Sequence, residues 1–196
     1  MPGGNIIKRE WWKFYNAKDY NVDGLVFITA DTGIKDKDTS DPSVFAAWHA
    51  GPRYLDLIGL ERGRWAFPEL KRRLHAFYQK HAERFGCNAV YIEDAASGDP
   101  LAHDLGEIGI PVTLWKPGDY QYPPDKLGRV RMSLWFIEGG RVRLPDDAPE
   151  ITGPFVDECS AFTGQKSDTD DQVDVATMAC SVCKWKGGFY DVQVAA

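Results

Sequence analysis

The sequence predicts a mixed α/β domain in which one central sheet is flanked by helices. Apolar runs of strand length alternate with longer stretches that have helical periodicity, and no internal repeat or low-complexity tract occurs. A chain of 196 residues with 13% aromatic residues can bury one substantial core. The formal net charge of −6 gives no long-range attraction for a polyanion. It does not exclude one, because a cluster of acids that holds metal ions lowers the net charge.

Five strands are expected in this sheet. Residues 24–31, GLVFITAD, form an uninterrupted apolar run that ends in Asp31, as a buried central strand would. A turn at Gly51-Pro52 joins the next two strands, so the first three strands are expected to be antiparallel. The four strands that follow the first are expected at residues 44–51, 53–64, 88–94 and 111–118.

The clearest helix is predicted over residues 67–86. Pro68 stands near its start, Leu70 and Leu74 recur on one face, and Gly86 suits its end. Shorter helices are expected at residues 100–109 and 124–140, a brief extended piece at 141–145, and a last helix at 170–188.

The cysteines are expected to be reduced thiols. The N-terminal stretch lacks the apolar region of a signal peptide, and no run approaches the length of a membrane span. Cys180 and Cys183 have the spacing of half a zinc site, but no second such pair accompanies them. We therefore favour core packing over metal binding for these two residues and expect no zinc site.

Acidic residues stand at three separate places. Asp31 and Glu93 each end an apolar strand, and Glu93 is followed directly by Asp94. A third group opens the last helix and comprises Asp168, Asp170, Asp171 and Asp174. Taken singly, each acid could be a turn residue, a solvated strand end or a helix cap. The first turn of the last helix nevertheless carries more negative charge than capping requires, because Asp174 lies four residues after Asp170 and three after Asp171.

This crowding indicates a site for divalent cations. Carboxylates repel one another unless a cation neutralises them, and oxygen ligands without His or Cys suit Mg²⁺ or Mn²⁺ rather than zinc. Two such ions held ~3.5–4 Å apart by shared carboxylates are used for in-line attack at a phosphodiester. The residues therefore favour a phosphoryl hydrolase.

Several stretches in this order and spacing resemble one family along nearly the whole chain. They are GLVFITADTGIKDKDTSDPSVFAAW, FPELKRRL, AVYIEDAASGDPLAHDL, DKLGRVR, IEGGRVRLP, FVDECSAF and DDQVDVATMA. Together they resemble the nuclease domain of the tailed-phage large terminase, the DNA-packaging endonuclease, which has an RNase H-like fold. The resemblance implies a five-stranded RNase H-like domain over residues 23–196, with residues 1–22 as a linker from a missing ATPase domain. No Walker A loop, GxxxxGK[ST], occurs in the chain.

The resemblance also implies roles for the acids. Asp31, Glu93 and Asp171 are expected to be catalytic and to bind two Mg²⁺ or Mn²⁺ ions, with Asp170 and Asp174 as auxiliary ligands. Asp41 matches a recurrent acid of unclear duty. Two departures leave Asp170 and Asp171 as alternatives: Thr169 stands where many relatives have His, and Phe162-Thr163 stands where they have Phe-Pro. Glu93 and Asp94 are alternatives as well, since strand alternation allows only one of them to face the metals.

DNA binding requires cations near the phosphates. The best candidates are Lys126 and Arg129, in the stretch that resembles the family's "DK..R", with Lys35 and Lys37 in the loop after the first acid. Arg62 and Arg64 are further candidates. Nothing resembles a base-reading module, so cleavage is expected to depend little on sequence. The small residues before Gly98 and Gly98 itself either let a DNA strand come close or simply form a tight turn.

The resemblance implies a metal-dependent endonuclease that cuts concatemeric double-stranded DNA in the host cytoplasm. Its expected partners are the terminase ATPase domain, the small terminase subunit and the portal, with no membrane. Two alternatives stay open from the residues: another RNase H-like enzyme, of the junction resolvase or transposase type, or a non-catalytic docking module whose acids only cap elements.

Overall fold

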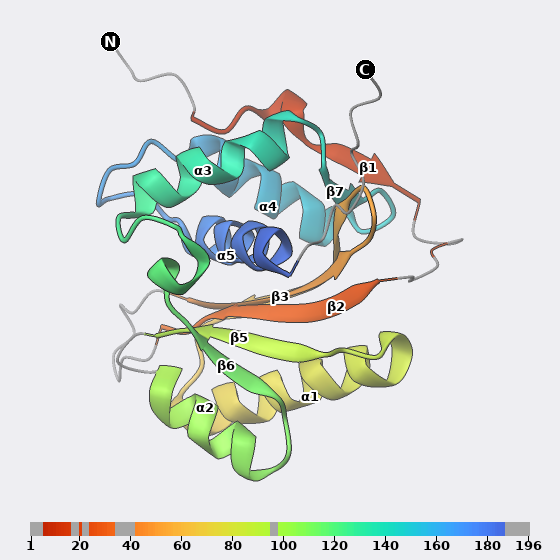
Figure 1. Ribbon diagram of the computed structural model, residues 1–196, viewed down its shortest axis with the longest axis vertical. Helices are drawn as coiled ribbons and strands as arrows, with labels where there is room; N and C mark the ends of the chain where they lie inside the picture. The colour runs from red at the N-terminus through yellow and green to blue at the C-terminus, as the bar shows by residue number, and fades with distance from the viewer. Residues whose placement is uncertain (1–5, 17–19, 21–23, 34–41, 95–97, 187–196) are drawn as a thin grey trace.

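The computed structural model describes residues 6–16, 20, 24–33, 42–94 and 98–186. Their centre is a mixed seven-stranded sheet in the order β1-β7-β4-β3-β2-β5-β6 (Figure 1). The strands are β1 (Lys13–Tyr15), β2 (Leu25–Asp31), β3 (Ser43–Ala50), β4 (Leu55–Gly63), β5 (Ala89–Glu93), β6 (Val112–Trp115) and β7 (Val142–Pro145). Strand β3 runs antiparallel to β2 and β4, and the remaining neighbours are parallel.

Helices cover both faces of the sheet. In Figure 1, α1 and α2 lie on one side of it, and α3, α4 and α5 lie on the other. The α-helices are α1 (Phe67–Phe85), α2 (Gly98–Glu107), α3 (Lys126–Glu138), α4 (Pro149–Ala161) and α5 (Asp171–Trp185), with 3-10 turns η1 (Arg9–Trp11) and η2 (Pro117–Tyr120). Among the described residues no helix has the length and apolar character needed to cross a membrane.

Side-chain alternation along β2 decides where its final acid points. Val26, Ile28 and Ala30 are fully buried in the core shared with α1 and α2. Thr29 faces the other side, where its hydroxyl donates to the carbonyl oxygen of Val175 in α5 at 3.0 Å. Because successive residues of a strand point to opposite faces, Asp31 lies on the α5 side.

Helix α5 lies between the sheet and the helices α3 and α4 (Figure 1). Its residues from Asp171 to Cys183 are all buried, which is typical of a helix enclosed on every side. The indole of Trp115 on β6 donates to Ser181 at 2.9 Å and ties the helix to the sheet. Cys180 and Cys183 are buried in this core, which confirms the interpretation as core packing.

The expected number of five strands is wrong, although the antiparallel arrangement of the first three expected strands is confirmed. The additional strands are β1 and β7, and β7 lies within the extended piece expected at residues 141–145. They pair in parallel with each other, and β7 also pairs with β4. With only three and four residues, neither is long enough to show a two-residue period. Strand β1 lies within residues 1–22, and whether this segment links the chain to an ATPase domain stays a prediction.

Helix α4 was not expected from the sequence. It carries Pro149 at its start, and Pro154 lies inside it. An internal proline removes a backbone hydrogen bond and opposes helix formation. Burial of Phe155, Val156 and Cys159 against the core outweighs this cost.

Candidate active site

Two acids stand at the ends of neighbouring parallel strands. Asp31 ends β2 and Glu93 ends β5, and Ala30 is paired with Ile92 in the register of these strands. Tyr91 belongs to the core on the α5 side, so alternation places Glu93 on that side as well. The prediction that Asp31 and Glu93 lie on neighbouring strands is confirmed, and both carboxylates face the beginning of α5.

Asp174, in the first turn of α5, completes a group of three carboxylates. One oxygen atom of Asp31, one of Glu93 and one of Asp174 all lie within 4.8 Å of one another. Within the part of the chain that the structure describes, no other such group of possible metal ligands occurs. The sequence resemblance implied instead that Asp171 is the third catalytic acid and that Asp174 is an auxiliary ligand.

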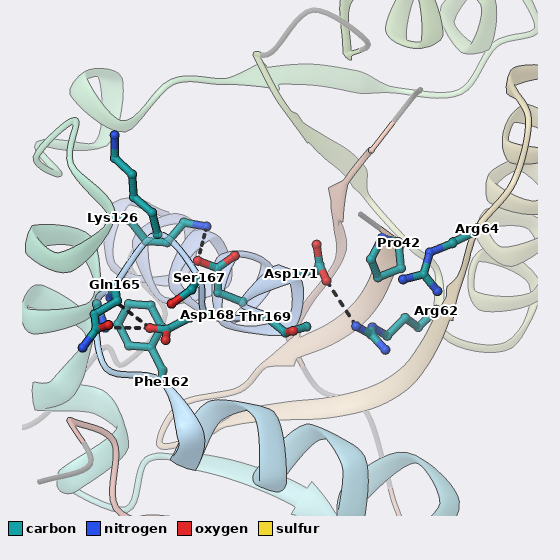
Figure 2. Close-up of a pocket in the computed structure, with 13 residues that line it drawn as sticks. Pro42, Arg62, Arg64, Lys126, Phe162, Gln165, Ser167, Asp168, Thr169 and Asp171 are labelled. Carbon is teal, nitrogen blue, oxygen red and sulfur yellow. Dashed lines mark hydrogen bonds and ion pairs between the residues drawn. The ribbon is translucent and has the colours of Figure 1, made fainter. Parts of the chain in front are cut away.

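Asp171 lies beside the group and is paired with an arginine. Its carboxylate is 3.2 Å from Arg62 Nη2 (Figure 2). The same guanidinium is 3.4 Å from Glu158. Asp171 remains close enough to Asp31 to raise the pKa of Asp31. The pairing of Arg62 on β4 with acids of α4 and α5 has no signal in the sequence, so it could not help to choose between the helix acids.

The three grouped carboxyls are difficult to ionise together. Burial, then the charges of Asp174, Glu93 and Asp171, raise the pKa of Asp31 well above its ordinary value. Burial and the charge of Asp174 likewise raise the pKa of Glu93. Burial raises the pKa of Asp174 more than its neighbouring cations lower it. Carboxylates in this arrangement repel one another, and a multivalent cation between them would relieve the repulsion.

The two basic residues expected to hold phosphates lie against these acids. Lys126 Nζ is 2.6 Å from Asp174 and 2.7 Å from Asp170. Arg129 Nη2 is 3.1 Å from Asp174 and 3.7 Å from Glu93. Lys126, Arg129 and Arg62 thus meet a larger set of carboxylates, which we call the acidic cluster: Asp31, Glu93, Asp170, Asp171 and Asp174. The cluster keeps an excess of negative charge.

Comparison with known proteins identifies the fold. No protein-family model matches the sequence, and no curated protein matches it either. The large terminase nuclease from thermophilic phage G20c does match in structure. With bound magnesium it is 20% identical over 88% of this chain and 94% of that chain, with a TM-score of 0.62. With bound zinc it is 21% identical over 88% and 95%, with a TM-score of 0.60.

Two further structures extend the match. The human cytomegalovirus terminase nuclease domain is 13% identical over 89% of this chain and 92% of that chain, with a TM-score of 0.61. A large terminase from another thermophilic bacteriophage is 13% identical over 87% of this chain but only 41% of its own, longer chain, with a TM-score of 0.63. The chain has the fold of a large terminase nuclease domain.

In this terminase nuclease fold, a groove runs from the acidic cluster to the surface. Its cavity has a volume of about 680 Å³. Figure 2 shows Arg62 and Arg64 of the β4 end on one side and Lys126 with the 162–168 loop on the other. Four basic side chains therefore line a passage that ends at carboxylates: Arg62, Arg64, Lys126 and Lys166.

Asp168 shapes one wall of the groove and belongs to no metal-ligand group among the described residues. Its carboxylate accepts hydrogen bonds from the backbone N–H groups of Thr163, Gly164 and Gln165, at 2.8, 2.8 and 3.1 Å. Burial opposes ionisation, but these hydrogen bonds outweigh it and lower the pKa of Asp168. The role expected of an isolated acid, to cap a turn, therefore applies to Asp168.

Of the two adjacent acids Glu93 and Asp94, only Glu93 belongs to the group of three carboxylates. Asp94 is turned away from the cluster and pairs with Lys116 at 3.2 Å. Behind Glu93, a Cβ atom added to Gly98 would lie only 2.2 Å from the Glu93 carbonyl oxygen, so the start of α2 can pack here only with glycine. Lys35, Lys37 and Asp41 lie outside the described residues.

Proposed function

We propose that the chain is a divalent-metal-dependent endodeoxyribonuclease of a DNA-packaging terminase, cutting concatemeric double-stranded DNA with little sequence specificity. One observation carries the proposal: Asp31, Glu93 and Asp174 converge within 4.8 Å from two strand ends and a helix start. The fold, which large terminase nuclease domains share, supports it.

The residues of the cluster suit two Mg²⁺ or Mn²⁺ ions. All of the side chains are carboxylates, which such hard cations prefer, and their excess negative charge is what bound cations would neutralise. Asp31, Glu93 and Asp174 would hold the first ion, and Asp171 with Asp170 would contribute to the second. When bound, such ions lower the pKa of a water nucleophile and neutralise the developing phosphate charge. The G20c nuclease has been solved with magnesium and with zinc, which supports a divalent site.

The chain's own residues would position the substrate strand. The sheet fixes the spacing of Asp31 and Glu93, because neighbouring strands lie ~4.8 Å apart. Arg129, buried beside Glu93 and Asp174, keeps these two carboxylates oriented. Arg62 and Arg64 would bind phosphates of the strand that enters the groove. Phosphate contacts of this kind carry no sequence information, which accounts for the low specificity.

The biological setting belongs to the same proposal. We infer that the nuclease works in the host cytoplasm together with a terminase ATPase domain, the small terminase subunit and the portal. The likeness to part of a longer phage large terminase supports this setting.

A cleavage assay on plasmid and linear duplex DNA tests the proposed function. We expect cutting of both substrates with Mg²⁺ or Mn²⁺ and none with EDTA. Asp31→Asn should be inactive, whereas Asp168→Asn, which changes an acid of the groove wall, should still cut. Preference for branched DNA would point to a resolvase-type enzyme instead. Absence of ion binding by the unmodified protein would point to a docking module.

A further inference from the structure

Lys126 contacts the acidic cluster and also lines the groove. It is the first residue of α3, and Asp125 before it caps that helix by accepting from the Gly128 N–H at 2.7 Å. Its ammonium contacts Asp170 and Asp174 of the acidic cluster, and the same side chain lines the groove. No other basic residue of the described chain both contacts Asp174 and lines the groove.

Arg129, one helical turn further along α3, is held far more firmly. Its side chain is 7% exposed, and Nη1 donates to the Pro124 carbonyl oxygen at 2.7 Å. The guanidinium also lies over the Trp115 ring, 5.8 Å from its centroid. Lys126 has no such enclosure, because its side chain is 33% exposed and stands at the groove. Of the two cations on Asp174, only Lys126 has room to leave.

The position of the ammonium conflicts with a divalent ion. Lys126 Nζ lies 2.6 Å from Asp174 Oδ2, and a metal ion bound by Asp174 would need the same carboxylate. The Lys126 ammonium lies between two carboxylates, so it occupies this place as a cation. Asp174 already contacts two cations, Lys126 and Arg129, and a divalent ion on the same carboxylate would repel both of them.

We propose that Lys126 is an exchangeable counter-cation: it neutralises Asp170 and Asp174 without metal, leaves them when a divalent ion binds, and then contacts a DNA phosphate in the groove. The inference rests on the proposed function and deepens it, because it makes DNA binding depend on prior metal binding. Since linkage is reciprocal, DNA should also strengthen the binding of the ion.

Metal titration of a Lys126 variant tests the exchange directly. Calorimetric titration with Mn²⁺ should show that Lys126→Met binds the ion about tenfold more tightly, a typical size for such coupling. Lys126→Arg, which keeps the charge, should bind more weakly than Lys126→Met. The matched control is Lys116→Met, which removes the same charge from Asp94 beside Glu93 and should leave the affinity unchanged.

The second step of the proposal, the contact of Lys126 with a DNA phosphate, is tested by measuring DNA binding with Ca²⁺ in place of Mg²⁺. In Ca²⁺, Lys126→Met should bind duplex DNA more weakly than the unmodified protein, with a salt slope lower by about one. In EDTA the two proteins should bind DNA alike. Thermal melting confirms that each variant is folded before it is titrated.

The outcomes separate this inference from the proposed function. Equal or weaker Mn²⁺ affinity in Lys126→Met would overturn the exchange while leaving the metal site in place. An identical DNA affinity of both proteins in Ca²⁺ would overturn the transfer to phosphate. Failure of the unmodified protein to bind Mn²⁺ at all would end both the exchange and the proposed nuclease.

Discussion

Two polar clusters lie at opposite ends of the same central strands, and they differ in charge balance. At the start of β4, Asp56 is 1% exposed, yet both of its oxygens accept from Arg143, at 2.7 Å each. The Tyr20 hydroxyl donates to the same carboxylate at 2.5 Å. One anion thus meets one cation and a full set of hydrogen bonds, as a buried ion pair requires.

At the end of β2, around Asp31, the negative and positive charges are not balanced. Among the described residues, the five carboxylates of the acidic cluster meet fewer cations than they need, and burial still raises the pKa of Asp31. Each cluster contains buried carboxylates, Asp56 in one and Asp171 and Asp174 in the other, so burial of charge alone does not separate a structural cluster from a functional one. An excess of charge of one sign does separate them. A fold keeps such an excess only where a group outside the chain can neutralise it.

The largest expected effect is the loss of cleavage in Asp31→Asn. A bound metal ion contributes several kcal/mol to transition-state stabilisation, and each 1.36 kcal/mol is tenfold in rate, so we expect a loss of about three orders of magnitude. Plasmid nicking with Mg²⁺ measures it. A variant that keeps more than a tenth of the activity would mean that Asp31 is a turn residue.

A substitution in the balanced cluster around Asp56 should change the stability of the protein rather than its cleavage activity. Asp56→Asn leaves the Arg143 guanidinium without its anion, which should lower the free energy of unfolding by about 3 kcal/mol. Urea denaturation in EDTA measures the change, and Glu61→Gln, which removes a more exposed ion pair on the same strand, should cost less than about 1 kcal/mol. Reduced Mn²⁺ affinity in Asp56→Asn would show that the two clusters are not independent.

A smaller difference is expected between the helix acids. Asp174→Asn should weaken Mn²⁺ binding by about a hundredfold and Asp171→Asn by only about tenfold, since Arg62 already neutralises Asp171. Calorimetric titration of both variants compares them. The reverse order would return Asp171 to the catalytic role that the sequence resemblance implied.

The smallest effect concerns the metal-free protein. Asp31→Asn removes one of several repelling charges, so its free energy of unfolding in EDTA should rise by about 1 kcal/mol. Melting of both proteins in EDTA tests this, and a lower midpoint for the variant would contradict it. A higher free energy of unfolding in Asp31→Asn and a lower one in Asp56→Asn would confirm the contrast between the two clusters.

The sequence predicts best what depends on local pattern. Asp31 and Glu93 could be placed because apolar strands that end in acid are visible in the sequence, although alternation alone left Glu93 and Asp94 as alternatives. The resemblance favoured Asp171 over Asp174 and left Asp170 and Asp171 as alternatives, because the sequence gives no sign that Arg62 from β4 pairs with Asp171. The Asp56 cluster could not be predicted for the same reason. Arg143 is remote in sequence, and the extended piece expected at residues 141–145 gives no sign that it pairs with β4.

The close packing behind Glu93 has a consequence for ionic size. The start of α2 at Gly98 blocks the Glu93 backbone from retreating, and the sheet fixes Asp31 beside it. An ion larger than Mg²⁺ must therefore be accommodated mainly by the side chain of Asp174, the ligand that α5 supplies. Ca²⁺ takes oxygen ligands at about 2.3–2.6 Å, against about 2.0–2.1 Å for Mg²⁺. We expect the site to bind Mg²⁺ with its side chains where they stand, and to bind Ca²⁺ with longer ligand distances that the Asp174 side chain takes up.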